Sequence, residues 1–151
     1  MKWNQPSILG YSDTCTVKLD FDDTDFKTVK YWAYRTKNWF RLNGFIILKS
    51  SEKNYHVVFD RPVSWTENFR IMSWVSILSK KGKLKDYALM QGIKGSSTLR
   101  FSPKGNKPSP RIVYRYGEQD DEIKGFLQFR GKIRDIKAKT SIELATSEKT
   151  T

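Results

Sequence analysis

The sequence of 151 residues predicts an α+β domain, because two kinds of hydrophobic periodicity alternate along it. In some segments every second residue is apolar, as in a half-buried strand, and in others every third or fourth, as in an amphipathic helix. The hydrophobic fraction of 38% and the aromatic fraction of 14% supply enough bulky side chains for a core at this length. We therefore expect one domain over residues 1–140 and a frayed polar tail over 141–151.

The first strand and helix are predicted over residues 15–40. A strand with one buried face is indicated by apolar residues at alternate positions, namely Cys15, Val17, Leu19 and Phe21. A helix of about four turns is indicated by positions at helical spacing, namely Phe26, Val29, Ala33, Thr36 and Phe40. Asp23 and Thr24 are natural N-caps for this helix, and the Asn43-Gly44 pair favours its end.

A hairpin and a second helix follow. The β-prone runs at 44–49 and 55–59 are separated by a short polar turn, which predicts two paired strands. Ser64 and Glu67 have the spacing of a capping box. Behind them, a helix ending near Gly82 is predicted by apolar positions at helical spacing, namely Ile71, Trp74, Val75 and Leu78. Further strands are expected at 98–101 and 111–116, and alternation at 125–136 favours another.

The resulting order is β-α-β-β-α-β followed by more β. This order fits a split βαβ sheet of the RRM or ferredoxin-like type, with two helices packed on one face and additional C-terminal strands. Such folds support many functions, so the order of elements names none of them.

Positive charge is concentrated in one part of the chain. The formal charge is +12, and residues 80–115 contribute +9 of it, from ten basic residues and the single acid Asp86. Such clustering favours a polyanionic partner, DNA or RNA, although a solvated basic face is the alternative. The segment is rich in Gly and Pro, which indicates a loop-rich surface. Its basic residues are Lys80, Lys81, Lys83, Lys85, Lys94, Arg100, Lys104, Lys107, Arg111 and Arg115.

Several classes of protein are excluded by composition. A single Cys15 excludes an internal disulfide, and one Cys with one His cannot form a Cys/His zinc site. Any metal is therefore expected on carboxylates. The sequence has no run of 18 apolar residues and no apolar stretch typical of a signal peptide, so we expect a cytoplasmic protein with no membrane span.

Asp20 and Asp22 form a D-x-D motif at the end of the first strand. Residues i and i+2 share a strand face about 7 Å apart, so both carboxylates can reach one cation or a pair of cations. Mg²⁺ and Mn²⁺ prefer such oxygen ligands. The alternative is an exposed strand end whose acids face water and cap the next helix.

Two later segments can bind phosphate. His56, the only histidine, is predicted on the same open sheet face as the acids, and Ser50 and Ser51 in the preceding turn offer hydroxyl donors. The alternative is a plain turn and a partly exposed sheet residue. Residues 95–107 contain no acid and combine small residues with Arg100, Lys104 and Lys107, although a basic hairpin without a ligand would look similar.

Together, these features resemble the archaeo-eukaryotic primase superfamily. Asp20 and Asp22 in LDFD match its D-x-D motif, and KSSEKNYHVVF with Ser51 and His56 resembles its serine and histidine motif. The segment TLRFSPKGNK resembles its arginine strand and downstream lysine, and Asp86 falls where a third metal-binding acid is expected. The resemblance covers about residues 13–116.

The resemblance implies a minimal DNA primase or polymerase that transfers nucleotides onto a 3′-hydroxyl. Asp20, Asp22 and Asp86 would hold Mg²⁺ or Mn²⁺ and, with His56, form the catalytic set. Ser50, Ser51, Arg100, Lys104 and Lys107 would bind nucleoside triphosphate. The template would lie on the basic residues Lys80, Lys81, Lys83, Lys85, Lys94, Arg111 and Arg115, with bases stacking on aromatics such as Trp65, Tyr87 or Tyr114.

Three alternatives remain open. A non-catalytic binder of single-stranded DNA or RNA, or a replication accessory protein, explains the +9 segment but gives no role to the D-x-D motif. A relaxase-type nuclease needs paired histidines, and the chain has only His56. A structural subunit with a decayed site, acting with a replication protein partner, is the third.

Overall fold

The computed structural model describes residues 9–132 and has the α+β class that the sequence predicts. The predicted tail at 141–151 lies outside the described residues. In chain order the elements are β1 (Gly10–Asp13), β2 (Lys18–Phe21), α1 (Phe26–Trp39), β3 (Gly44–Ser51), β4 (Asn54–Asp60), α2 (Trp65–Ser79), α3 (Gly82–Lys94), β5 (Ser97–Arg100) and β6 (Arg111–Gly117). A further helix occupies residues 122–132.

The main sheet has four strands in the order β2-β4-β3-β6, each antiparallel to its neighbours. Because β4 is antiparallel to both β2 and β3, these two strands run parallel on either side of it. The path β2-α1-β3 therefore leaves β4 between two parallel strands, while the last strand of the sheet, β6, lies beside β3. The RRM or ferredoxin-like arrangement stays a prediction. β5 pairs with β1 in a separate two-stranded sheet.

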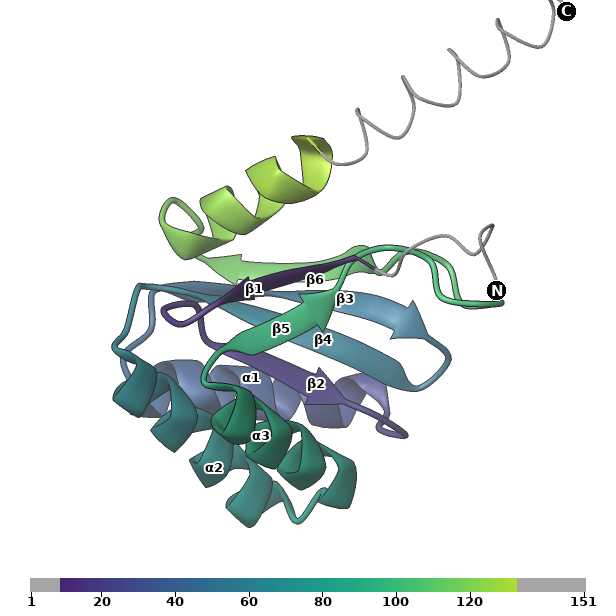
Figure 1. Cartoon of the computed structure of the whole chain (residues 1–151). Coiled ribbons are helices and arrows are strands. Elements are labelled where there is room, and N and C mark those ends of the chain that lie inside the picture. The colour runs from purple at the N-terminus through teal and green to yellow at the C-terminus, as the bar shows by residue number, and fades with distance from the viewer. Residues whose placement is uncertain (1–8, 133–151) are drawn as a thin grey trace, which may run out of the picture.

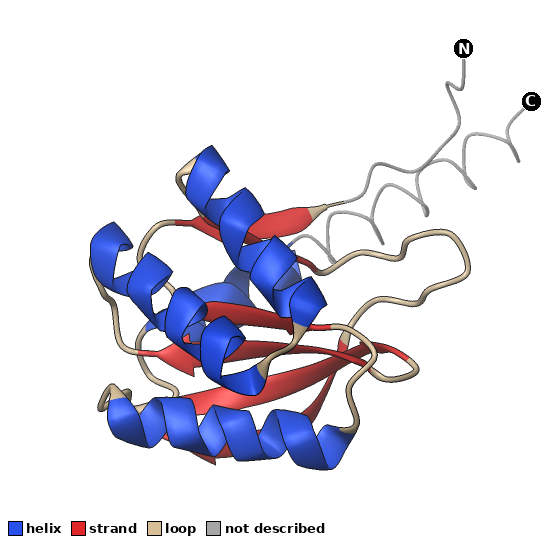
Figure 2. Cartoon of the chain, turned by 90° about the horizontal axis from the view of Figure 1, so that it is seen from below, coloured by secondary structure: helices blue, strands red, loops and turns tan. Residues whose placement is uncertain are grey.

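Three helices cover one face of the main sheet. α1, α2 and α3 lie beneath it in Figure 1 and in front of it in Figure 2. The main core fills the space between them and the sheet. β2 contributes Leu19 and Phe21, and Val17 just before it joins them, as the alternation predicts, whereas Cys15 is half-buried and lies outside this core. α1 contributes Val29 and Ala33 to the same core.

The opposite face of the sheet is also covered, by β1, β5 and helix 122–132 (Figure 1). A second core lies there, formed by Ile46, Leu48, Val58, Leu99, Ile123 and Phe126. The strand predicted at 125–136 is wrong over 125–132, which are helical. Ile123, Phe126 and Arg130 are buried at spacings of three and four residues, which is the period of a helix. The local alternation of apolar and polar residues hid this longer period in the sequence.

Helix α3 was not expected. The sequence predicts that α2 ends near Gly82 and that a loop-rich basic surface follows, but Lys80 takes a left-handed conformation and a new helix begins at Gly82. Its buried residues Leu84, Ala88 and Gln91 lie at spacings of four and three. The described residues thus hold four helices rather than two, because tertiary burial outweighs the local signals of glycine and clustered lysine.

The helix caps agree in part with prediction. Ser64 caps α2, and its hydroxyl accepts a hydrogen bond from the Glu67 amide at 3.2 Å. The cap of α1 is Asp25 rather than Asp23 or Thr24, and its carboxylate accepts from the Thr28 amide at 2.7 Å. Among the helices described, none combines the length and apolar character needed to cross a bilayer.

Candidate active site

Asp20 and His56 face each other across the β2–β4 pair. They are register partners, and the His56 Nε2 atom lies 3.6 Å from the Asp20 Oδ1 atom. Since Leu19 and Phe21 point into the main core, Asp20 points to the opposite face, where β1, β5 and helix 122–132 lie. The alternation of β2 therefore places this carboxylate as predicted.

We expected that face of the sheet to be open, but it is covered. His56 is only 5% exposed, and the side chain of Asp20 is 28% exposed. The reason is the second core, in which Leu48, the register partner of His56 on β3, is also buried. A sheet surface for stacking bases in the manner of an open RRM sheet is thus absent from the described part of the chain.

Burial dominates the electrostatics of the pair. It raises the pKa of Asp20 to about 7, with a further contribution from the negative charge of Asp22, while Arg100, Lys107 and Lys104 act in the opposite direction. Burial also lowers the pKa of His56 to about 3, helped by the positive charges of Arg100 and Lys107. At neutral pH, His56 is therefore uncharged and Asp20 is close to its midpoint.

Arg100 connects the site to two loops. Its guanidinium donates to the carbonyl oxygens of Ser102 and Pro108, the latter at 3.1 Å, and to that of Ser50 at 3.4 Å. The first two bonds hold the 101–110 loop, and the third reaches the β3–β4 hairpin. Burial lowers the pKa of Arg100, and the charge of Asp20 partly offsets this effect.

Ser50 and Ser51 are used in closing the hairpin turn. The Ser50 hydroxyl donates to the Asn54 carbonyl oxygen at 3.2 Å, and the Asn54 side-chain amide donates to the Ser51 hydroxyl at 2.6 Å. Their first role is therefore the turn, although both residues also line the pocket beside it.

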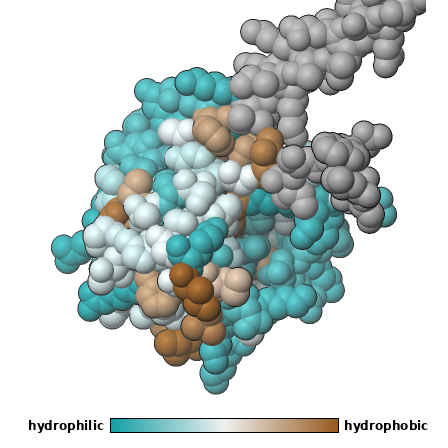
Figure 3. All heavy atoms as spheres, viewed as in Figure 1, coloured by the Kyte–Doolittle hydropathy of each residue, from teal (hydrophilic) through white to brown (hydrophobic). Residues whose placement is uncertain are grey.

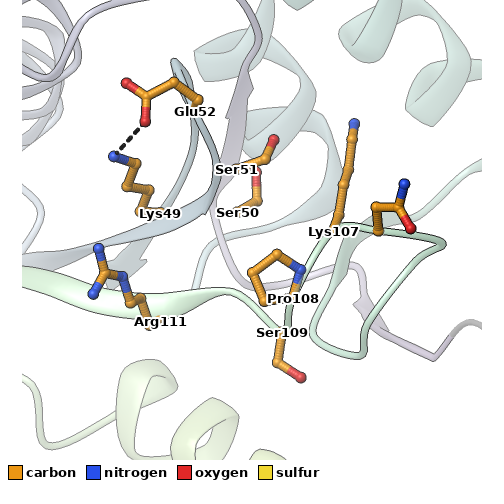
Figure 4. A pocket seen from close by; sticks show the side chains of 9 residues that line it. Lys49, Ser50, Ser51, Glu52, Lys107, Pro108, Ser109 and Arg111 are labelled. Carbon is orange, nitrogen blue, oxygen red and sulfur yellow. Dashed lines mark hydrogen bonds and ion pairs between the residues drawn. The ribbon is translucent and has the colours of Figure 1, made fainter.

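A pocket of about 570 Å³ lies between this hairpin and the 101–110 loop (Figure 4). Lys104 and Lys107 exchange two backbone hydrogen bonds of 2.9 Å, which form a tight turn at the tip of the loop. Lys107 lines the pocket and also affects the pKa values of Asp20 and His56, so the pocket adjoins the acidic site. The lining residues are Lys49, Ser50, Ser51, Glu52, Asn106, Lys107, Pro108, Ser109 and Arg111.

The remaining predicted basic residues lie in separate places. Lys80, Lys81 and Lys83, at the α2–α3 turn, line a hollow of about 180 Å³ together with Asp22 and Asp23. A neighbouring hollow is lined by Lys85. Lys94 donates to the Thr98 hydroxyl, and Arg115 on β6 donates to the Gln119 side chain at 3.1 Å. Arg111 is exposed beside the pocket.

Asp86 does not join the other two acids. It is exposed on α3, two residues from buried Leu84 and therefore about 200° around the helix from the face that packs on the sheet. Asp22 raises the pKa of Asp20, whereas Asp86 is not among the largest contributions to that shift. Within residues 9–132, His56 thus contacts Asp20, and the charges of Asp22, Arg100, Lys104 and Lys107 act on the pKa of this carboxylate.

Lys18 and its neighbours were not singled out by the sequence. The Lys18 side chain is fully buried, and its ammonium donates to the Asp13 carboxylate at 2.6 Å and to the Ser97 hydroxyl at 3.0 Å. Asp13, Cys15 and Glu122 present ligand atoms within 4.8 Å of one another beside it. The sequence shows only that Lys18 occupies a polar position in the alternation of its strand. Its partners in the ion pair and hydrogen bond come from other segments, so the sequence could not predict them.

The aromatics proposed for base stacking pack against the core instead. Trp65, Tyr87 and Tyr114 are all partly buried there, and the Tyr87 hydroxyl donates to the Thr98 carbonyl oxygen at 2.9 Å. Burial raises the pKa of Tyr87 well above its ordinary value.

No family model matches the chain, and comparisons with curated proteins and with solved structures find no match. The assignment of function therefore depends on the residues themselves.

Proposed function

We propose that this protein is a metal-dependent nucleotidyltransferase acting on nucleic acid, with an RRM-like primase or polymerase core. The observation that carries the proposal is the convergence of charged and polar groups on Asp20. Asp22, His56 and Arg100 come from three separate segments, and each contacts this carboxylate or shifts its pKa. Carboxylates beside arginine and lysine are the groups that a reaction between a cation, a triphosphate and a hydroxyl requires.

Asp20 and Asp22 have the chemistry to hold Mg²⁺ or Mn²⁺. Burial and the neighbouring Asp22 charge disfavour the ionised form of Asp20, and a cation between the two carboxylates would relieve both effects. When bound, such an ion neutralises charge on the triphosphate and lowers the pKa of an attacking 3′-hydroxyl. Asp86 remains a predicted third ligand that lies apart from this pair.

The basic side chains bind the anionic substrate. Arg100 is held by carbonyl oxygens on both sides of the site, so its position is fixed before a nucleotide arrives. Lys107 lines the pocket and its charge acts on Asp20, which suits a triphosphate that reaches from one to the other. His56, with a pKa of about 3, acts as a neutral hydrogen-bonding group and not as a proton carrier at neutral pH.

The test is extension of a primed DNA template with nucleoside triphosphates and Mn²⁺ or Mg²⁺. Asp20→Asn and Asp22→Asn should each lower the rate at least about 100-fold, because each removes a charged ligand, while leaving DNA binding intact. Asp23→Asn is the matched control, since it makes the same change at the next, exposed position and should extend like wild type.

Asp86→Asn decides whether a third acid takes part, because its loss of rate should match that of Asp22→Asn only if the two share a cation. Firm DNA binding with no synthesis under either metal would refute the proposal and favour a non-catalytic binding protein.

A further inference from the structure

The solvent-facing side of α1 carries four side chains that the proposed transfer site does not use. Lys27, Tyr31, Arg35 and Trp39 follow one another at intervals of four residues, so they form one stripe along the helix. All four are exposed, Tyr31 by 55% and Trp39 by 69%. This α1 stripe lies across the sheet from Asp20, because α1 packs on the other sheet face (Figure 1).

Positive charge predominates along α1, and the one carboxylate of residues 9–132 whose pKa Lys27 is shown to lower is Asp25, which caps the helix. The helix contains four basic residues and no acidic one, and none of the four forms an ion pair with a carboxylate of residues 9–132. Lys30 and Lys37 lie over the rings of Tyr114 and Tyr116, at 4.6 and 5.7 Å from their centres. A helix of this composition attracts a polyanion.

The aromatic rings of the stripe are held in place by their neighbours. The Arg35 guanidinium lies 5.2 Å from the Trp32 ring centre and 5.7 Å from that of Trp74, and it donates to the Tyr31 hydroxyl at 3.2 Å. Trp39 stacks on Trp74 with centres 5.9 Å apart and planes 11° apart. Exposed rings fixed in this way lose little freedom when a ligand binds.

We propose that the α1 stripe binds single-stranded nucleic acid, with bases stacked on Tyr31 and Trp39 and phosphates paired with Lys27 and Arg35. Rings alternating with cations match the alternation of base and phosphate in a single strand. Tyr31 and Trp39 are eight residues apart, about 12 Å along the helix, so an oligonucleotide and not a mononucleotide spans them. A second copy of the chain is disfavoured, because it would oppose two helices of like charge.

Another exposed apolar surface provides the comparison. Leu89, Met90 and Ile93 are exposed on α3, and Ile93 is 83% exposed. Figure 3 shows apolar side chains gathered low in the same view as Figure 1. The three α3 side chains are aliphatic and offer no ring for a base. Ile93→Ala is therefore a matched control for loss of exposed apolar area outside the stripe.

The test is fluorescence anisotropy of a fluorescein-labelled dT20 oligonucleotide. Tyr31→Ala and Trp39→Ala should each weaken binding about fivefold or more, and Trp39→Phe, which keeps a ring, should retain most of the affinity. Lys27→Gln should reduce the slope of log affinity against log salt by about 0.7, the effect of one lost phosphate contact. Ile93→Ala should bind like wild type.

Wild-type dT20 affinity in folded Tyr31→Ala and Trp39→Ala variants, checked by circular dichroism, would overturn the proposal. So would loss of binding to phosphatidylglycerol vesicles in these variants with dT20 binding unchanged, since the stripe would then recognise a lipid surface. The proposal is independent of catalysis. A protein that binds dT20 through the stripe but extends no primer would uphold it while refuting nucleotidyl transfer.

Discussion

Asp20 and His56 lie 3.6 Å apart, and the same burial shifts their ionisation in opposite directions. The pKa of Asp20 rises from 3.8 to about 7, because burial disfavours the charged form of a carboxylate. The pKa of His56 falls from 6.5 to about 3, because burial disfavours the protonated, charged form of an imidazole. The folded state therefore favours the neutral form of both residues.

These shifts have opposite consequences for stability. Between about pH 4 and 7 the folded state holds a proton on Asp20 that the unfolded chain releases, so this residue makes stability fall as pH rises. Between about pH 3 and 6.5 the unfolded chain holds a proton on His56 that the folded state lacks, so this residue makes stability rise with pH. The two contributions largely cancel from about pH 4 to 6.5.

Single variants should separate the contributions of Asp20 and His56 to the pH dependence of stability. Relative to wild type, the free energy of unfolding of Asp20→Asn should rise with pH between 4 and 6.5, and that of His56→Gln should fall, each by up to about 1.4 kcal/mol per pH unit. Urea unfolding in the presence of EDTA measures both slopes. If both variants keep the wild-type pH profile, burial does not set these pKa values.

The element that most changes the candidate site is helix 122–132, because it covers the sheet face that carries His56. Asp60, buried at the end of β4, holds the start of this helix. Its Oδ1 atom accepts hydrogen bonds from the amides of Asp121 at 3.1 Å and Ile123 at 3.0 Å. A carboxylate at a helix N-terminus also interacts favourably with the helix dipole.

Asp60→Ala should therefore loosen the helix from the sheet and lower the free energy of unfolding by about 2 kcal/mol or more, because it leaves buried amides without an acceptor. Asp60→Asn, which keeps an acceptor but loses the charge, should cost less. Asp120→Ala, at an exposed position beside the helix start, is the control. Urea unfolding measures stability, and hydrogen exchange at Ile123 reports the local effect. Unchanged exchange in Asp60→Ala would contradict this role.

Across the whole molecule, the positive charge occupies several separate surfaces. The +9 of residues 80–115 is divided among the α2–α3 turn, α3, β5, the 101–110 loop and β6, and α1 adds four further cations. A single strand that follows more than one of these surfaces neutralises several phosphates at once.

Affinity for dT20 should accordingly fall linearly on a plot of log affinity against log salt, with a slope of magnitude about 3 or more, since each phosphate contact in a single strand contributes about 0.7. Anisotropy titrations at several KCl concentrations measure the slope. A flat response would exclude an extended nucleic-acid surface on any of these elements.

Local patterns in the sequence were sufficient to predict α1, the β3–β4 hairpin, the capping box of α2 and which residues of β2 face the main core. Each depends on neighbours in sequence: Val17, Leu19 and Phe21 alternate, and Ser64 caps the amide of Glu67 three residues away. The same alternation of side chains along β2 placed Asp20 on the face opposite the main core. The residue types of the candidate site, two acids, one histidine and an arginine with lysines, were therefore predictable.

Only the tertiary structure decided which of these residues meet and which face is covered. α3 is held by burial of Leu84 and Ala88 against other elements, and it carries Asp86 on its exposed side, away from Asp20. The second core, to which β5 and helix 122–132 contribute, covers the sheet face on which His56 is buried, and Lys18 forms an ion pair with Asp13. The physical reason is that burial and electrostatic coupling sum contributions from distant segments, and no local window of the sequence contains those partners.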